Sequence, residues 1–395
     1  MKKFFLIILS YLFITFNTFV FADNNNKVLK IGILAPFSEE LKTLGETILF
    51  SANLALHDIG ADSIKLYPVG YSNDKNEINK ACEKFKEEGV KIVLGPVDSK
   101  FLKELNRCSE IVFLSLSNMD ANINDNVIMM GVNLESQLLA IKKLIKKKKK
   151  KKTIILYPDN EYSKHVERNI RFINFQNSKV FKYSNDPKIL TNQIEKLTNY
   201  KKRKINLNAR IKKLENSEDP KDLNELNILK QRFTLGKVNF DSVVIIDFDN
   251  GLKSILTSLA YTDVSEKDVL IVAANQWFDK SILTESSIKE FYFPSVNLEN
   301  LEKFKKDFFK IHNYKPNEVG ILAYDCIGLI YYLWKNDTII KSVNNFNFKK
   351  EIKGKIGKFK ISDNKVIQSL EIYKLENSNF VKNKLGDGRI FIYMG

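Results

Sequence analysis

The feature that most constrains the fold of this chain is an alternation of short apolar runs with longer helical patterns. The first apolar run, Val28–Ala35, follows a stretch of asparagines and ends before Pro36, which predicts a buried strand. Apolar side chains then recur at helical spacing over residues 43–59, and Gly60 ends that pattern. Because strands that alternate with helices pair as parallel neighbours with helices on both faces of the sheet, the chain is predicted to be α/β.

The alternation runs along the chain twice, so we expect two sheets. The first series continues with strands at 64–69, 90–94, 111–116 and 127–130 and helices at 75–88 and 99–108. The second series has helices at 135–149, 162–175, 187–200 and 250–261 and strands at 153–157, 179–183, 242–247 and 269–273. Two sheets of this kind, joined by several crossings of the chain, predict a hinged, two-lobed architecture of parallel sheets flanked by helices.

The last hundred residues change character. Two more helices are expected at 298–311 and 317–335, and residues 356–361 and 370–374 then alternate apolar and polar side chains around a turn at Asp363–Asn364. This pattern is typical of antiparallel strands. The expected division is therefore lobe 1 from residues 28–133 and 295–350, and lobe 2 from residues 134–294 and 351–395.

Residues 201–237 are longer than any loop that the alternation requires. Apolar residues recur at helical spacing on both sides of Ser217–Pro220, where an N-cap followed by proline predicts the start of a second helix. We therefore predict a helical hairpin that projects from lobe 2, with eleven basic and five acidic residues. Two interpretations stay open, namely a docking element and a tolerated surface insertion.

The first 22 residues have the pattern of a secretory signal peptide. Lys2 and Lys3 precede the almost wholly apolar stretch Phe4–Val20, and Ala22 closes the triplet that a signal peptidase reads. We expect cleavage after Ala22 and a periplasmic protein; a retained membrane anchor is the alternative reading. No cysteine lies near the cut, so a lipid anchor is not expected.

The charge and the cysteines restrict the function further. The formal net charge is +16, which is compatible with an anionic partner or with a general excess of lysine, while export argues against nucleic acid. The seven lysines of 146–152 predict a solvated helix end or a site for lipid or peptidoglycan carboxylates. Cys82, Cys108 and Cys326 have no metal-binding spacing. We expect Cys82 and Cys108 to be free thiols, because neighbouring helices reach disulfide distance only at close crossings.

The sequence contains no known arrangement of catalytic residues. A nucleophile elbow, a zinc-protease helix, a phosphate-binding loop and paired CxxC motifs are all absent, and His57, His165 and His312 are isolated from one another. We therefore expect a protein that is not an enzyme and that uses no metal or cofactor.

Five segments resemble, in matching order, the type 1 periplasmic binding proteins of the branched-chain amino-acid class. They are KIGILAPFSEELKTLGETILFSANLALHD at 30–58, IVLGPVDSK at 92–100, YPDNEYSK at 157–164, LAYDCIGLI at 322–330 and IGKFKISDNKVIQSLEIYKLENSNFV at 356–381. The helix that contains ALHD, and the segment NARIKKLEN before FDSVVIIDFD, are most similar to the penicillin-binding protein activators within this group.

This resemblance implies a regulator or scaffold for peptidoglycan synthases, the class A penicillin-binding proteins, without catalysis of its own. The alternative is the substrate-binding subunit of an ABC importer for amino acids or amides, whose partners would be the importer's membrane subunits and a small amino-acid-like ligand. Both functions use the same fold, so the fold alone does not separate them.

Ligands of open α/β sheets bind beyond the carboxyl ends of the strands, and this rule selects the candidate site. The candidates in those loops are Ser38, Ser99, Ser115, Ser117, Asn118, Tyr162 and Trp277. Ser99 is expected to begin a helix whose free N–H groups could hold an α-carboxylate. The resemblance implies contacts at Ser99, at Ser115 or Ser117, and at Tyr162, while an N-cap and loop hydroxyls are the structural alternatives.

The first loop departs from the family pattern. Ser38 is followed by Glu39 and Glu40, where the family has glycine after the serine. Two carboxylates near a bound carboxylate would repel it, so this loop favours contact with a protein over binding of an amino acid.

Overall fold

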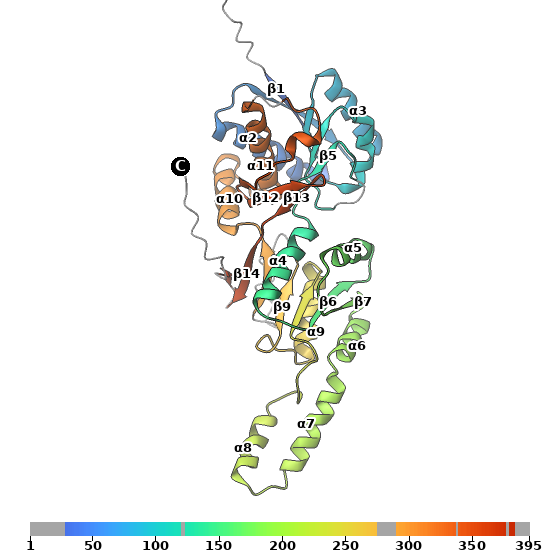
Figure 1. The fold of residues 1–395 in the computed structure, drawn as a ribbon, viewed down its shortest axis with the longest axis vertical. Coiled ribbons are helices and arrows are strands. Elements are labelled where there is room, and N and C mark those ends of the chain that lie inside the picture. The colour runs from blue at the N-terminus through green and yellow to red at the C-terminus, as the bar shows by residue number, and fades with distance from the viewer. Residues whose placement is uncertain (1–27, 120–122, 275–289, 337–338, 377–378, 384–395) are drawn as a thin grey trace, which may run out of the picture.

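The computed structural model describes residues 28–119, 123–274, 290–336, 339–376 and 379–383, and it contains two stacked lobes and a projecting arm (Figure 1). The predicted signal peptide, residues 1–22, and Trp277 lie outside the described residues. Within the described ranges, no helix is both long enough and apolar enough to span a bilayer.

Lobe 1 is built on an eight-stranded sheet with the order β11-β12-β13-β5-β4-β3-β1-β2. Its strands are β1 (Leu29–Pro36), β2 (Ile64–Tyr71), β3 (Ile92–Leu94), β4 (Val112–Ser115), β5 (Val127–Met129), β11 (Ile352–Gly354), β12 (Gly357–Ser362) and β13 (Lys365–Gln368). β1 to β5 pair in parallel, as the alternation predicts, and β12 pairs antiparallel with both of its neighbours.

Helices cover both faces of this sheet. They are η1 (Glu39–Leu41), α2 (Lys42–Ile59), α3 (Lys75–Glu87), η2 (Ser99–Cys108), α10 (Leu298–His312), α11 (Val319–Lys335) and η4 (Val343–Phe346). One buried apolar cluster joins α2, α10 and α11 to the sheet, and a second joins α3 and η2 to the opposite face.

Lobe 2 repeats the plan with a seven-stranded sheet in the order β15-β14-β10-β9-β8-β6-β7. Its strands are β6 (Thr153–Pro158), β7 (Ser178–Tyr183), β8 (Ser242–Ile245), β9 (Leu270–Ala273), β10 (Phe291–Ser295), β14 (Glu371–Glu376) and β15 (Asn379–Lys382). Its helices are α4 (Leu134–Lys147), α5 (Ser163–Ile173), α6 (Pro187–Leu197), α7 (Tyr200–Leu214), α8 (Pro220–Leu229) and α9 (Asp249–Tyr261). Two apolar clusters, one on each face, form its core.

The C-terminal strands are divided between the lobes, which corrects the expected boundary. Residues 351–395 were assigned to lobe 2 as a whole, but β11, β12 and β13 extend the sheet of lobe 1, and only β14 and β15 join lobe 2. The Met129 N–H donates to the Asn364 carbonyl at 2.8 Å and attaches the β12–β13 turn to β5. An alternating pattern identifies a strand but does not specify which sheet edge the strand completes.

Three chain crossings connect the lobes, and polar side chains tie them together. Asn133 donates from its side chain to the Val366 carbonyl at 2.6 Å, and the Gln368 N–H donates to the Ser136 hydroxyl at 3.0 Å. Lys365 forms an ion pair with Glu135 at 2.5 Å, and both side chains are largely buried. The first and third crossings are therefore joined by specific hydrogen bonds.

Cys82 of α3 and Cys108 of η2 form a disulfide, with Cα atoms 5.9 Å apart. The prediction of two free thiols was wrong, because α3 and η2 pack against each other at the close range that a disulfide requires. Cys326 is a buried free thiol.

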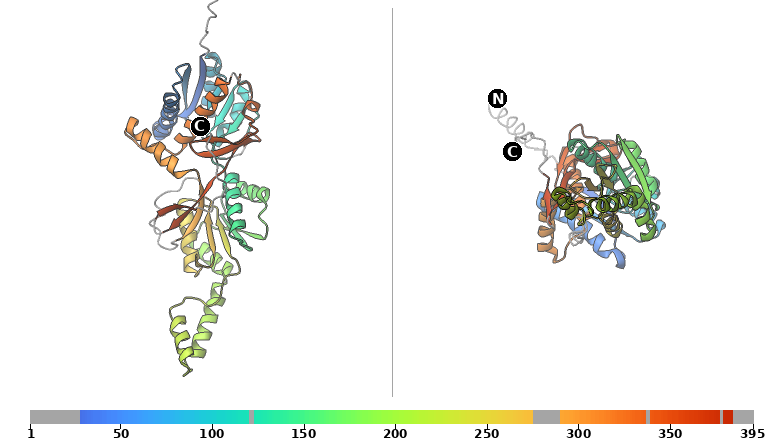
Figure 2. Two further views of the ribbon diagram at one scale, coloured as in Figure 1. Left: turned by 60° about the vertical axis from the view of Figure 1, so that its left-hand side comes forward. Right: turned by 90° about the horizontal axis from the view of Figure 1, so that it is seen from below.

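The segment 201–237 contains α7 and α8, which pack against each other and project from the end of lobe 2 away from lobe 1 (Figures 1 and 2). Leu207, Leu214, Leu226 and Leu229 form a small apolar core between the two helices. This pair of helices with its flanking residues is called the arm below.

Candidate functional site

The carboxyl ends of the two sheets face the region where the chain crosses between the lobes. β5 ends at Met129, and the chain then enters α4 of lobe 2 at Leu134. α4 leads away from lobe 1, so β6 and its parallel neighbours run back toward lobe 1 (Figure 1). β10 ends at Ser295 and crosses back to α10. The loops after the parallel strands are therefore the candidate site, as expected for open α/β sheets.

At the edge of lobe 1, Ser99 does not cap the helix that it begins. Asp98 is the N-cap of η2, and its carboxylate accepts the Lys100 N–H at 3.0 Å. The Lys100 ammonium also lies 2.9 Å from Asp98. The protein's own carboxylate thus occupies the position where an anionic ligand was expected, and Ser99 Oγ lies 3.9 Å from Met119 Sδ instead.

Ser115 and Ser117 serve the loop after β4. Ser115 is fully buried, and its hydroxyl donates to the Pro96 carbonyl at 2.8 Å and accepts the Ser117 N–H at 3.2 Å. Ser117 accepts the Met119 N–H at 3.2 Å. The Ser115 hydroxyl therefore holds the backbone of a neighbouring loop and the Ser117 hydroxyl that of its own loop, which was the structural alternative for these serines.

Ser38 and Asn118 complete the lobe 1 candidates. Ser38 precedes η1, is half-buried and makes no side-chain cap, and Glu39 and Glu40 beside it are exposed. Asn118 is exposed at the end of the β4 loop. Together with Asp98, the two glutamates give this edge three carboxylates.

At the edge of lobe 2, Tyr162 belongs to a small aromatic cluster. Its ring lies 4.9 Å from that of His165 and 5.7 Å from that of Phe248, measured between ring centroids. Tyr162 is half-buried, whereas Phe248 is 43% exposed. These rings form an apolar surface beyond β6 and β8, which could contact an apolar ligand group or a protein surface.

Asp247 is a buried acid at this edge that sequence reasoning missed. It follows β8, accepts the hydroxyl of Tyr183 and accepts the Phe248 N–H at 2.8 Å. Burial raises the pKa of Asp247 above its ordinary value, although both hydrogen bonds oppose the shift. A single acid at the end of the apolar run Val243–Ile246 was the signal that could have identified it.

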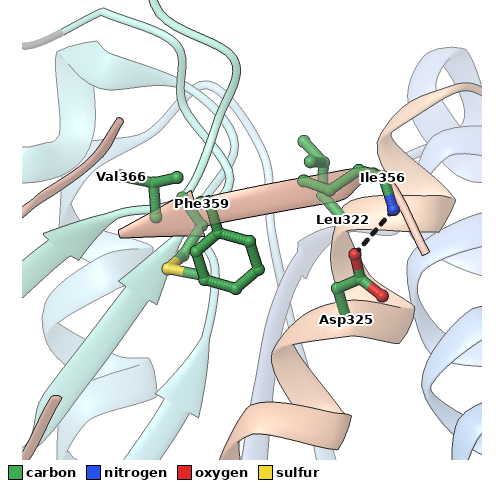
Figure 3. A pocket seen from close by; sticks show the side chains of 6 residues that line it. Leu322, Asp325, Ile356, Phe359 and Val366 are labelled. Carbon is green, nitrogen blue, oxygen red and sulfur yellow. Dashed lines mark hydrogen bonds between the residues drawn. The ribbon is translucent and has the colours of Figure 1, made fainter. Parts of the chain in front are cut away.

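Asp325 is a second buried acid, and it belongs to α11, which packs on the sheet of lobe 1. Its carboxylate accepts the N–H groups of Lys355 at 2.8 Å and Ile356 at 3.0 Å, and it therefore fastens α11 to the β11–β12 turn (Figure 3). A Cβ atom at Gly354 would collide with this carboxylate. Burial raises the pKa of Asp325 to about 6.

A cavity of about 10 Å³ adjoins Asp325, which is roughly the space of one water molecule. The residues that line it are Met130, Leu322, Asp325, Ile356, Phe359 and Val366 (Figure 3). Such a cavity is too small for an amino acid, so Asp325 has a structural role.

These contacts define what the facing edges offer chemically. Ser99, Ser115 and Ser117 lie together in lobe 1. The hydroxyls of Ser115 and Ser117 and the N-terminus of η2 already form hydrogen bonds within the protein. Tyr162 lies in the other lobe beside Phe248. Among the described residues, no group of three or more His, Cys, Asp or Glu side chains is arranged to hold a metal ion.

Comparison with known proteins identifies the fold. No protein-family model matches the chain, and no curated protein sequence matches it. Among solved structures, the chain is similar to the C-domain of LpoA (YraM) from Haemophilus influenzae, a regulator of PBP1A. That match has a TM-score of 0.59 and 14% identity and covers 90% of this chain and 99% of the domain.

Two further structures extend this comparison. Full-length LpoA from Haemophilus influenzae matches with a TM-score of 0.62 and 14% identity over 91% of this chain, which spans 59% of LpoA. The branched-chain amino acid transporter substrate-binding protein LivJ from Streptococcus pneumoniae, in complex with isoleucine, matches with a TM-score of 0.51 and 17% identity. The match covers 90% of this chain and the full length of LivJ. The chain therefore has the two-lobed fold of the type 1 periplasmic binding proteins, as its sequence resemblance predicted.

Proposed function

We propose that this protein is a periplasmic, non-catalytic regulator of a peptidoglycan synthase, and that it acts through contact with that protein. The similarity to the C-domain of LpoA, a regulator of PBP1A, supports the proposal. The observation that carries it is the state of the lobe 1 edge, where the loop hydroxyls and the start of η2 are already occupied.

The electrostatics of that edge point the same way. Glu39 and Glu40 would repel the α-carboxylate of an amino acid, and the start of η2 already holds the Asp98 carboxylate. A protein partner needs neither a vacant anion site nor closure of the lobes.

The test uses the mature chain from residue 23 and a purified class A penicillin-binding protein of the same organism. We expect direct binding and a faster rate of glycan polymerisation when the two are mixed. Bovine serum albumin at equal concentration serves as the control for nonspecific stabilisation of the synthase. An absence of both binding and rate change would rule the proposal out.

The competing function is a substrate-binding subunit of an amino-acid importer, and the aromatic cluster at Tyr162 and Phe248 is the observation that favours it. A ligand at about a hundred times its dissociation constant would stabilise the folded protein by about 2.7 kcal/mol. We expect no thermal shift with isoleucine at millimolar concentration. A clear shift would favour the importer function over the regulator.

A further inference from the structure

The charges of the arm are segregated between its two helices. α7 has seven basic residues and no acidic residue among its 15 positions, whereas α8 has one basic and two acidic residues. The basic residues of α7 are Lys201, Lys202, Arg203, Lys204, Arg210, Lys212 and Lys213. A general excess of lysine over the whole chain does not account for such a one-sided helix, because the neighbouring helix does not share it.

Two of these basic residues hold the arm in place. Arg203 is only 6% exposed, and its guanidinium donates to the carbonyls of Gly236, Thr262 and Asp263 at 3.0 Å. Arg210 makes a two-pronged contact with Glu225 of α8, at 2.8 and 2.7 Å. The arm is therefore a braced projection whose position is set before any partner arrives, which lowers the entropy lost on binding.

Four of the five remaining basic residues, all lysines, form a stripe on the other side of α7. At about 100° per residue, Lys201, Lys202, Lys212 and Lys213 all lie within about 80° of Ile205 around the helix. All five residues are exposed, and Ile205 is 66% exposed. This stripe, which we call the outer face of α7, points away from the small core that joins α7 to α8.

Helix stability explains only the C-terminal half of this arrangement, where Lys212 and Lys213 lie in the last turn and complement the dipole. Lys201, Lys202 and Lys204 lie in or next to the first turn, where the helix dipole disfavours positive charge. Asn199 precedes them with a φ of 52° and provides no side-chain cap. The left-handed Asn199 ends α6, so the departure from local preference lies in the charges at the start of α7, and it makes this segment a candidate for a binding role.

The exposed apolar residues of the arm, which include Phe233 beyond α8 at 73% exposed, do not gather on one helix face, and this argues against a lipid surface as the partner. A helix that lies on a membrane needs its apolar side chains on one face. In α8, Leu223 and Ile228 are exposed but lie about 140° apart around the helix axis. In α7, lysines surround the exposed Ile205. Single apolar side chains among cations fit the polar rim of a protein interface better than a bilayer.

We propose that the outer face of α7 docks on an acidic protein surface, and that this surface belongs to the synthase. The identity of the partner rests on the proposed function, whereas the acidic character rests on the charges of α7. Lysines at the edge of an interface act mainly by steering the encounter, so the association rate is the quantity that should respond.

The test measures association of the synthase's periplasmic portion with the triple variant Lys202→Glu, Lys212→Glu, Lys213→Glu. The matched control is Lys303→Glu, Lys306→Glu, Lys349→Glu, which makes the same charge change at exposed positions of lobe 1. At about 0.1 M salt we expect the α7 variant to associate about tenfold more slowly and the control less than about twofold. The difference should shrink at about 0.5 M salt because the charges are screened.

The folded state is checked by thermal unfolding. Lys202→Glu near the helix start agrees with the dipole, whereas Lys212→Glu and Lys213→Glu in the last turn oppose it, so we expect only a small decrease in the melting temperature. Equal losses in both triple variants would show a bulk charge effect and overturn the inference. So would a variant that loses binding to phosphatidylglycerol vesicles but still binds the synthase. An intact protein that does not bind the synthase overturns the proposed function together with this inference, whereas binding that the α7 variant keeps overturns this inference alone.

Discussion

The two lobes share one plan of sheet and helices but are fastened in different ways. Lobe 1 has a disulfide between α3 and η2 and a buried carboxylate, Asp325, that holds two backbone N–H groups. Lobe 2 is joined instead by contacts between polar side chains, such as Tyr183 with Asp247, and by Arg203 at the root of the arm.

Lobe 1 therefore uses its polar groups to stabilise the fold, whereas lobe 2 carries the exposed surfaces that are available for contact. In lobe 1, the polar groups at the carboxyl edge of the sheet are used to hold loops. In lobe 2, Phe248 and the outer face of α7 remain exposed for contact. We therefore expect changes in lobe 1 to affect stability, and changes in the exposed parts of lobe 2 to affect binding. The charge variants of α7 test the binding half of this contrast, and the following predictions test how firmly each lobe is fastened.

The largest effect on stability is expected from the disulfide of lobe 1. It closes a loop with a sequence separation of 26 residues, and the loss of such a link lowers the free energy of unfolding by about 3.5 kcal/mol. The double variant Cys82→Ala, Cys108→Ala should show this loss in urea denaturation. Reductant should destabilise the parent protein but leave the double variant unchanged. A parent protein that is insensitive to reductant would contradict the prediction.

Arg203→Met is the corresponding change in lobe 2. It removes a buried guanidinium and leaves the carbonyls of Gly236, Thr262 and Asp263 without their donor. Unfolding should become easier by about 3 kcal/mol, since each buried acceptor left unpaired costs about 1–3 kcal/mol and water can reach some of them. The control is Lys237→Met, which removes an exposed ion pair with Asp268. If both variants melt alike, Arg203 does not brace the arm.

Asp325 should make stability depend on pH in a recognisable direction. Its pKa is raised to about 6 in the folded protein from an ordinary 3.8, so the folded state binds the proton more tightly than the unfolded state. The contribution of this group is greatest below about pH 4 and declines as the pH rises through 6, by about 3 kcal/mol in total.

Asp325→Asn isolates this contribution. The variant cannot titrate, so its free energy of unfolding minus that of the parent should rise by about 2 kcal/mol between pH 4 and 7. A constant cost from the amide group, which cannot accept both N–H groups, is superimposed on that slope. A difference that does not vary with pH would show that the carboxylate stays ionised.

The smallest effect is expected from Tyr183→Phe in lobe 2. The change removes the hydroxyl that donates to Asp247 but keeps the buried ring. A single lost hydrogen bond of this kind should cost about 1 kcal/mol, measured by thermal unfolding. Tyr332→Phe, at a tyrosine that is 57% exposed, is the control and should be neutral. An equally neutral Tyr183→Phe would mean that Asp247 finds another donor, such as water.

Several elements of the fold could be predicted because local patterns encode them. The apolar runs over 28–35 and 242–247 became β1 and β8, and the proline after Asp219 begins α8 of the arm. The N-cap that was the structural alternative for Ser99 proved to be Asp98, because both residue types cap helices and the choice depends on how the loop enters the helix.

The candidate site was predictable only in outline. The rule of carboxyl strand ends selected loops that border the chain crossings, but it does not say whether a side chain in a loop faces a ligand or its own backbone. Ser115 is the clear case, because its hydroxyl points to the Pro96 carbonyl in a fully buried position. Asp247 and Asp325 were missed because their partners come from residues 64 and 31 positions away along the chain.

By itself, the sequence determined the α/β class, the order of strands and helices, and the existence of a basic arm. Each of these depends on the spacing of apolar and charged residues within one short segment. The tertiary structure decided which sheet received β11 to β13, whether Cys82 met Cys108, and which polar groups at the sheet edges were already paired. These outcomes depend on the relative positions of segments far apart in the chain, and only packing of the whole molecule sets such positions.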